Sequence, residues 1–273
     1  MARLGLALIG AGFLSLFVFT GLQLFSGPAL GSDYTFFLPR LLYGYFWQVE
    51  NGFFSIPWFS PAFCGGLPYF ADPQVMFFSL PQAMLWVLNP AETVLATFLT
   101  FGILAAVGTY LLLRSLGVGT WLSLTGALLF AFNEFFLFRT LIGHLTYHVF
   151  ALIPLLAWCL VKALEADGFR SAWWQLSGGV LIAIIVHGGA LNFLVPAMLS
   201  VASLLALNVL VTGFGLARHV RILGQAGLIG FLLSVSKIVA GYAFVSGFPR
   251  KRCRWACLRA SVRPRSPSSR CCL

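Results

Sequence analysis

Asp33 is the residue of this chain whose surroundings best suit acid–base chemistry. It stands in SGPALGSDYTFFLP, eight residues after the end of a long apolar run over residues 4–25. A carboxylate in that position lies close enough to a membrane surface to meet a lipid-borne substrate. The proline- and aromatic-rich chain around it suits a site that holds the side chain still and excludes water. We therefore predict a functional role for Asp33.

Other ionisable residues gather on the same predicted side of the membrane. Glu50 and Asp72 belong to the loop that contains Asp33, and two later loops on that side hold or border Glu134, Arg139, His144, His148 and His187. Each residue also has a purely structural explanation: Glu134 and Arg139 can pair at a helix end, the last two histidines can be packing residues, and Glu50 can be solvated. The convergence on one face is what indicates a site.

The segment FCGGLPYFADPQ, residues 63–74, is a second unusual feature of the first loop. Gly65 and Gly66 permit a tight bend, and Pro68 stiffens the exit from it. We predict that this segment is the return limb of the loop, with its aromatic side chains on the membrane surface. The turn then brings the two ends of the loop together.

The elements that must position these residues are membrane-spanning helices. Hydrophobic residues make up 60% of the 273-residue chain and charged residues only 9%. A spanning helix needs about 20 largely apolar residues, because the bilayer core offers no water to satisfy open backbone groups. The fold class expected is therefore an all-α, polytopic membrane protein of about seven transmembrane helices, over residues 4–25, 94–113, 120–137, 146–163, 173–187, 191–212 and 222–245.

The basic residues of the short loops orient this topology. If Arg3 is cytoplasmic, the loops that carry Arg114, Lys162, Arg170, Arg218 and Arg221 also fall inside, as the positive-inside rule requires. Residues 26–74 then form a large first extracytoplasmic loop. Residues 75–88 are apolar but short and interrupted by a proline, so we predict an interfacial or re-entrant segment there. Counting this segment as a span would place five of the basic residues outside.

The formal charge of +10 belongs to the end of the chain and does not indicate nucleic-acid binding. Residues 1–248 carry 9 basic and 7 acidic residues, whereas residues 249–273 carry 8 basic residues and no acidic one. We predict two parts: a transmembrane module over residues 1–248, and a basic Cys/Arg/Pro/Ser tail over residues 249–273. The tail is either disordered, as a basic arm at anionic lipid headgroups, or the product of a frameshift.

Two stretches resemble the YfhO-type bacterial integral membrane proteins, which are similar to the GT-C class of glycosyltransferases. The first is GSDYTFFLPRLLYGYFWQVENGFFSIPWFSPAFCGGLPYFADPQVMFFSLPQ, and the second is RTLIGHLTYHVFALIPLL. The matching residues, in their order along the chain, are Gly31, Asp33, Pro39, Asn51, Gly52, Pro57, Trp58, Gly65, Gly66, Pro68, Gln74, Phe77, Phe78, Pro81, Gly143, His144 and Pro154. The resemblance covers most of residues 1–248.

This resemblance implies an enzyme that takes a sugar from a polyprenyl-phosphate donor and passes it to a glycan or lipid acceptor outside the cytoplasm, in the bacterial plasma membrane. Asp33 is then the general base, and a divalent metal ion is a possible cofactor, with Asp33 and Asp72 as possible ligands. The residues expected to contact the substrates are Asp72, Gln74, Trp58, Arg139, His144 and Lys237. Of these, the last three are candidates to stabilise the leaving phosphate. Lys237 lies within a predicted span, where a charge is costly, although snorkelling to the interface is an equal explanation.

The chain departs from the family pattern in two ways. The asparagine expected soon after the Pro-Trp pair is absent, since Phe59 and Ser60 follow Trp58. The family's proteins are also much longer, so the resemblance implies that this chain corresponds to their N-terminal part. A transporter or flippase of a lipid-linked or small solute remains an alternative, as does a non-catalytic membrane fragment.

Overall fold

The computed structural model describes residues 33–212 and 215–247, together with residues 15 and 18. All regular structure in these ranges is helical, and Ser60 and Leu67 form an isolated β-bridge. The all-α fold class is thereby confirmed. The predicted span over residues 4–25 and the predicted tail over residues 249–273 lie outside the described residues.

Five helical segments of the described chain are long and apolar enough to cross a membrane, which supports a multi-pass membrane protein. They are Pro90–Ser115 (α5), Thr120–Ile142 (α6, Thr120–Ala131, and α7, Glu134–Ile142), Leu145–Glu165 (the 3-10 helix η1, Leu145–Leu152, and α8, Ile153–Glu165), Gly168–His187 (α9) and Leu216–Gly247 (α11). A further helix, α10 (Leu191–Thr212), has a shorter apolar stretch at Leu194–Leu210. The expected total of seven spans stays a prediction.

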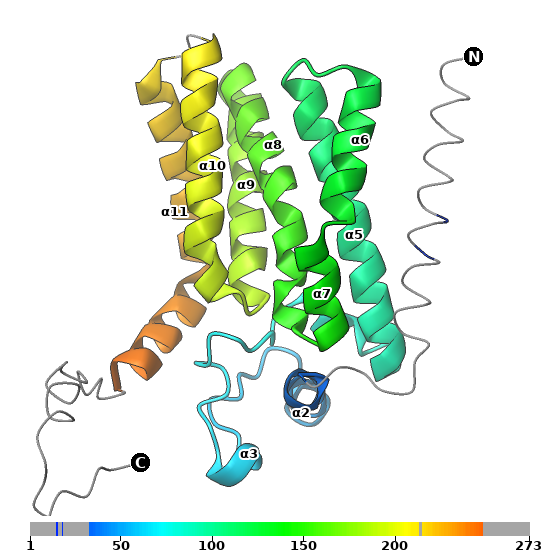
Figure 1. Ribbon diagram of the computed structural model, residues 1–273. Helices are drawn as coiled ribbons and strands as arrows, with labels where there is room; N and C mark the ends of the chain where they lie inside the picture. Colours follow the sequence, from blue (N-terminus) through cyan, green and yellow to red (C-terminus); the bar gives the residue numbers. More distant parts are fainter. Residues whose placement is uncertain (1–14, 16–17, 19–32, 213–214, 248–273) are drawn as a thin grey trace, which may run out of the picture.

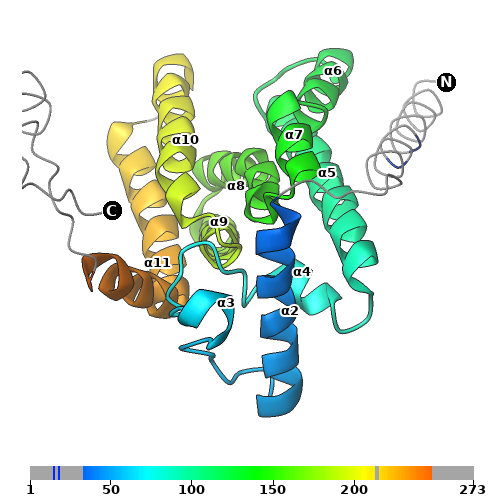
Figure 2. The same cartoon turned by 60° about the horizontal axis from the view of Figure 1, so that its bottom comes forward.

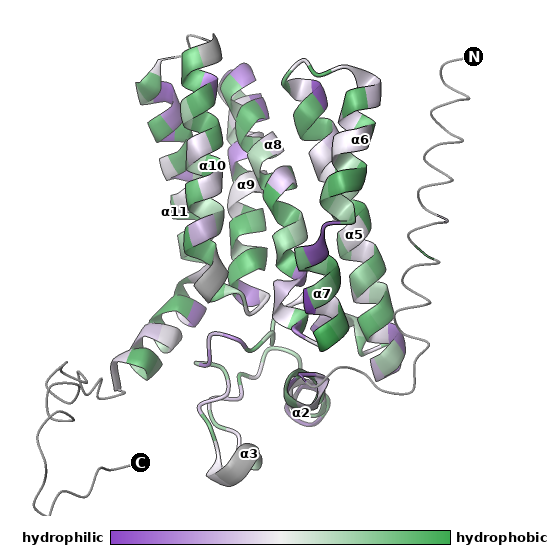
Figure 3. Cartoon of the chain, viewed as in Figure 1, coloured by the Kyte–Doolittle hydropathy of each residue, from purple (hydrophilic) through white to green (hydrophobic). Residues whose placement is uncertain are grey.

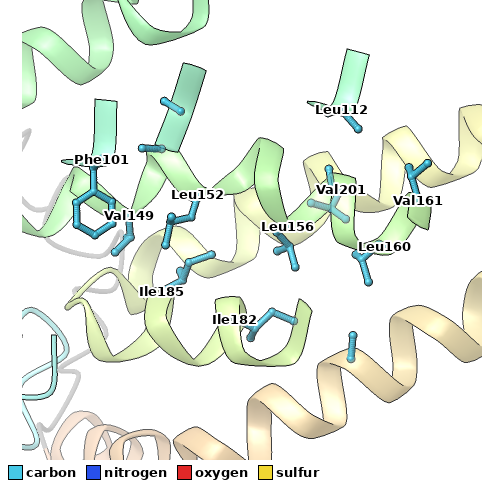
Figure 4. Packing of buried hydrophobic residues seen from close by; sticks show 14 of the residues in the cluster. Phe101, Leu112, Val149, Leu152, Leu156, Leu160, Val161, Ile182, Ile185 and Val201 are labelled. Carbon is cyan, nitrogen blue, oxygen red and sulfur yellow. The ribbon is translucent and has the colours of Figure 1, made fainter. Parts of the chain in front are cut away.

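These helices lie side by side in a bundle (Figures 1 and 2). Helix α8 is the most buried of them, and its side chains Leu156, Leu160 and Leu164 are almost fully enclosed by α5, α9 and α10. Figure 4 shows this core from nearby. Helices α9 and α11 approach closely at Gly179, which has no side chain. A Cβ there would lie only 2.5 Å from the side chain of Ile229. Small residues at a helix crossing are a common means of close packing in membranes.

The outer faces of the bundle remain apolar. Figure 3 shows hydrophobic residues along most of the length of the bundle helices. Large side chains that are more than half exposed occur on α6, α10 and α11, among them Leu122, Leu129, Leu207, Leu210, Leu232 and Val239. A lipid environment accounts for such faces better than water does.

The segment expected as the first outer loop contains a substantial helix. Helix α2 (Tyr34–Asn51) lies across one end of the bundle, where Figure 1 views it end-on. Its buried residues, Tyr34, Phe37, Arg40, Leu41, Gly44 and Gln48, recur with helical spacing. The helix is therefore stabilised by packing against the bundle end, in spite of an internal proline.

The chain returns from α2 to α5 through short elements. These are α3 (Ala62–Gly65) and α4 (Leu80–Met84), the second capped by the Ser79 hydroxyl. Residues 75–88 thus hold one short helix and turns rather than a helix of spanning length. Near the far end of α2, the Trp86 indole donates to Gln48 Oε1 at 3.2 Å and ties the two segments together.

Candidate functional site

Asp33 stands at the start of α2 and is fixed there by backbone contacts. Its carbonyl accepts from the amides of Phe36 and Phe37, and its own amide donates to the carbonyl of Ile142 at the end of α7, at 3.0 Å. The next residue, Tyr34, donates its hydroxyl to the Thr140 carbonyl at 2.7 Å. The N-terminus of α2 is therefore attached to the end of α7.

A glycine turn at the end of α7 makes this attachment possible. Gly143 has a φ of +95°, and the following amide, that of His144, donates back to the Arg139 carbonyl at 2.9 Å. This is the usual way in which a glycine terminates a helix and reverses the chain. A Cβ at Gly143 would lie 2.4 Å from the backbone nitrogen of Tyr34, so a side chain would collide with α2. The turn returns His144 to the side of Arg139.

Three side chains from these two elements form a connected cluster, which we call the Asp33 cluster (Asp33, His144 and Arg139). His144 Nε2 contacts Asp33 Oδ2, and Arg139 Nη1 lies 2.9 Å from His144 Nδ1. An arginine side chain has donors and no acceptor, so Nδ1 accepts this hydrogen bond. Nε2 then carries the imidazole proton and donates it to the carboxylate.

Aromatic rings pack against His144, but the cluster stays partly exposed. Tyr147 stacks on the His144 ring, with centroids 5.5 Å apart and an interplanar angle of 20°. Phe37 meets the same ring edge-on, at 5.6 Å. The side chain of Asp33 retains 37% of its exposure and that of His144 retains 24%. No side-chain hydrogen bond caps α2 from Asp33, and no described residue donates a hydrogen bond to its Oδ1.

A second group of polar residues, three of them charged, meets further along α2 at Arg40, and we call it the Asp72 cluster (Asp72, Arg40, Gln74 and Lys237). Arg40 Nη1 donates to Asp72 Oδ2 at 2.6 Å, and the Gln74 amide donates to Asp72 Oδ1 at 2.9 Å. Both carboxylate oxygens are thereby used. Arg40 and Asp72 side chains keep only 10% and 14% of their exposure.

Lys237 anchors the return limb from the side of α11. Its Nζ donates to the carbonyls of Phe70, Asp72 and Val75, at 2.8, 2.8 and 3.1 Å. The residue is 1% exposed. Three donors directed at three carbonyls satisfy the ammonium group fully. This geometry explains a charge within a helix, and it gives no support to the prediction that Lys237 binds a phosphate.

The remaining predicted site residues lie apart from Asp33. The backbone carbonyl of Gln74 packs against Gly189, where a Cβ would approach it to 2.7 Å. Trp58 is 59% exposed and meets Phe70 edge-on at 5.5 Å. Sugar contacts by these two residues stay predictions.

The two predicted metal ligands belong to different clusters. Arg40, the partner of Asp72, follows Asp33 by seven residues, or about 10 Å along a helix. Among the described residues there is no group of three or more His, Cys, Asp or Glu side chains that could hold a metal ion. A metal at Asp33 and Asp72 therefore stays an untested prediction.

Sequence reasoning did not assign roles to Arg40, Tyr34 or Tyr147. The sequence did contain a signal for Arg40, because residues 26–74 hold this single basic residue and three acidic ones. The two tyrosines carried no comparable signal, since their contacts depend on the docking of α2. Burial raises the pKa of Tyr34 above its usual value.

Comparison of the chain with protein-family models, with curated proteins and with solved structures gives no match. The function is accordingly inferred from the geometry of the two clusters and from the sequence.

Proposed function

We propose that the protein is a membrane glycosyltransferase of the GT-C type, which transfers a sugar from a polyprenyl-phosphate donor to an acceptor outside the cytoplasm. The observation that carries the proposal is the partly exposed Asp33 carboxylate at the end of an apolar helical bundle: His144 contacts one oxygen, and no described residue donates to the other. A carboxylate that is positioned but not saturated suits a general base.

The chemistry is a single displacement at the anomeric carbon. The acceptor hydroxyl oxygen forms the new bond to that carbon, the bond to the phosphate oxygen breaks, and the phosphate leaves with the electron pair. Asp33 Oδ1 takes the hydroxyl proton.

An apolar cavity of about 540 Å³ supports a lipid-linked donor. It lies between residues 77–83 and the helices α5, α8 and α9, and its lining includes Phe53, Phe78, Phe101, Leu155 and Ile184. Such a lining suits a hydrocarbon chain better than a polar solute.

The distribution of charge favours an extracytoplasmic position for Asp33. The basic residues Arg114, Lys162, Arg170, Arg218 and Arg221 lie at or near helix ends that are remote from α2 (Figure 1). By the positive-inside rule this end faces the cytoplasm. The Asp33 cluster then faces the outer side, where the acceptor is.

Replacement of Asp33 by Asn tests the proposal. In sealed vesicles from cells that express the gene, we expect transfer from radiolabelled undecaprenyl-phosphate hexoses supplied on the α2 side. Asp33→Asn should lower the rate by about 10²- to 10⁴-fold, because the amide cannot take the proton. Membrane insertion should be unchanged.

Glu50→Gln is the matched control, since it makes the same change of charge at an exposed position of the same helix. It should leave the rate unchanged. Normal transfer by Asp33→Asn would falsify the role of Asp33, and absence of transfer by the wild-type chain from every hexose donor would contradict the proposed function.

A further inference from the structure

We propose that Arg139 is a positioning residue, which acts through His144 to present Asp33 as a carboxylate with one free oxygen. This inference rests on the proposed function for its catalytic consequence, but the arrangement itself can be measured without any activity. Nothing in the sequence pattern assigned this role, since Arg139 was expected to contact the phosphate.

The direction of the hydrogen bonds carries the inference. Arg139 supplies the donor at 2.9 Å from Nδ1, so that nitrogen has no room for a proton of its own. The only imidazole proton is then on Nε2, which faces Asp33 Oδ2. The guanidinium group thus sets which ring nitrogen accepts and which one donates.

The position of Arg139 is itself well defined. Its guanidinium carbon lies 5.0 Å from the centroid of the Tyr147 ring and 5.4 Å from that of Phe135. Tyr147 therefore contacts the cation and the imidazole at once. The hydrogen bond from the His144 amide to the Arg139 carbonyl holds the backbones of the two residues close together in space. Cation–π contacts of this kind hold a guanidinium plane in a set orientation.

The consequence for Asp33 follows from the charge of its partner. A neutral N–H donor orients the carboxylate and leaves it without a full counter-ion, whereas an imidazolium would form an ion pair and make it a poorer proton acceptor. The ionisable groups that face His144 are Asp33 from the start of α2, Arg139 from α7 and Tyr147 from η1. Of these, Arg139 is the group that contacts Nδ1.

Nitrogen NMR of the histidine side chains tests the inference directly. The chain has four histidines, so a ¹⁵N-histidine-labelled sample in nanodiscs gives few signals, and a His144→Gln sample assigns those of His144. Long-range proton–nitrogen correlations distinguish the two neutral tautomers from the imidazolium. Near pH 7 we expect the neutral Nε2–H pattern in the wild type.

Arg139→Met removes the donor while keeping an extended side chain. Without the donor at Nδ1, its His144 should lose the wild-type nitrogen pattern, whereas Arg139→Lys, which keeps a charged donor, should retain most of it. Arg170→Met, at an exposed position beyond the other end of the bundle, should match the wild type. An imidazolium in the wild type, or an Arg139→Met spectrum equal to that of the wild type, overturns the inference.

Transfer rates separate this inference from the proposed function. Arg139→Met should lower the rate by up to about 10²-fold, as expected for a misplaced base, with partial recovery in Arg139→Lys. If the spectra change as expected but Asp33→Asn transfers normally, the positioning role stands and the proposed function fails. If Asp33→Asn is inactive and the spectra do not change, the reverse holds.

Discussion

Asp33 and Asp72 stand at the two ends of the same connecting segment, and each contacts a basic side chain, yet their environments differ. Asp72 accepts from a guanidinium group and from a backbone amide, so that both of its oxygens are used. Asp33 contacts one imidazole nitrogen and keeps more than twice the side-chain exposure, at 37% against 14%. Asp72 thus accepts a hydrogen bond at each oxygen, whereas the described residues donate to only one oxygen of Asp33.

The difference indicates that the two clusters have different roles, one structural and one functional. When a buried charge loses its partner, the remaining charge is left uncompensated. The Asp72 cluster therefore has the character of a structural joint. The Asp33 cluster, with a partly exposed carboxylate and a partly exposed imidazole, has the character of a site. Substitutions in the first should act mainly on stability, and substitutions in the second on chemistry.

The largest effect on stability is expected at Lys237. Lys237→Met keeps most of the side-chain length but leaves the buried carbonyls of Phe70 and Val75 without their donor, while the Asp72 carbonyl still accepts from the Val75 amide. Each unsatisfied group costs about 1–3 kcal/mol, so we expect a loss of about 2–6 kcal/mol in the free energy of unfolding. Denaturant titration in detergent measures it. Lys162→Met is the control, because Lys162 makes only a partly exposed pair with Glu165, and it should change little. Equal stability of the two variants would remove the structural role of the Asp72 cluster.

A smaller effect is expected from Gly143→Ala, which disturbs the Asp33 cluster. The substitution places a Cβ in the left-handed region and against the Tyr34 nitrogen. Gly117→Ala is a matched control, since Gly117 also has a positive φ, of 81°, but nothing lies within 4 Å of its Cβ position. Backbone strain alone costs about 1–2 kcal/mol, so Gly117→Ala should lose that much and Gly143→Ala more.

The spectrum of His144 should also change in Gly143→Ala and not in Gly117→Ala, because only the first displaces α2 from the end of α7. Two variants that lose the same stability and leave His144 unaltered would argue against close docking of α2.

The smallest effect on stability is expected at two tyrosines, one beside each cluster. Tyr34 donates to the Thr140 carbonyl and Tyr69 to the Arg40 carbonyl, and burial raises the pKa of both above the usual value. In the unfolded chain a tyrosine loses its proton near pH 10. Above that pH the unfolded state binds fewer protons than the folded state, so stability falls as pH rises.

We therefore expect the wild type to lose stability between about pH 9 and pH 11, and Tyr34→Phe and Tyr69→Phe to lose less over the same range. At neutral pH each variant should be less stable by about 1 kcal/mol, because a hydrogen bond is missing. Unfolding midpoints at several pH values measure both effects. A wild-type midpoint that does not change with pH would show that neither hydroxyl titrates on unfolding.

Much of the bundle could be predicted from the sequence, because long apolar runs have few alternatives to a helix in a membrane. The predicted ranges from residue 94 onward each coincide with helical segments, although Asn133 interrupts one of them by capping a new helix. Helix α2 was not predicted, since an internal proline and several aromatics suggested a loop. Its stability comes from packing against the bundle end, which no local pattern reports.

The candidate site was predicted as a set of residues and not as an arrangement. Asp33, Arg139 and His144 were expected on one face, and the structure brings them into contact. Their order, with the histidine between the other two, depends on the turn at Gly143 and on the docking of α2. Lys237 was singled out for its buried charge, but its partners are backbone carbonyls, which a sequence does not identify.

Helix α2 is joined along its buried face to three segments that are distant in the sequence: to Thr140 and Ile142 near its start, to Tyr69 and Asp72 near its middle, and to Trp86 near its far end. A rigid rod held at three points has little freedom to tilt or slide. A displacement of the Trp86 segment or of the Asp72 segment must therefore either break an attachment or move the whole rod. The orientation of the Asp33 carboxylate therefore depends on the entire connecting segment. Substitutions far from the carboxylate can change it.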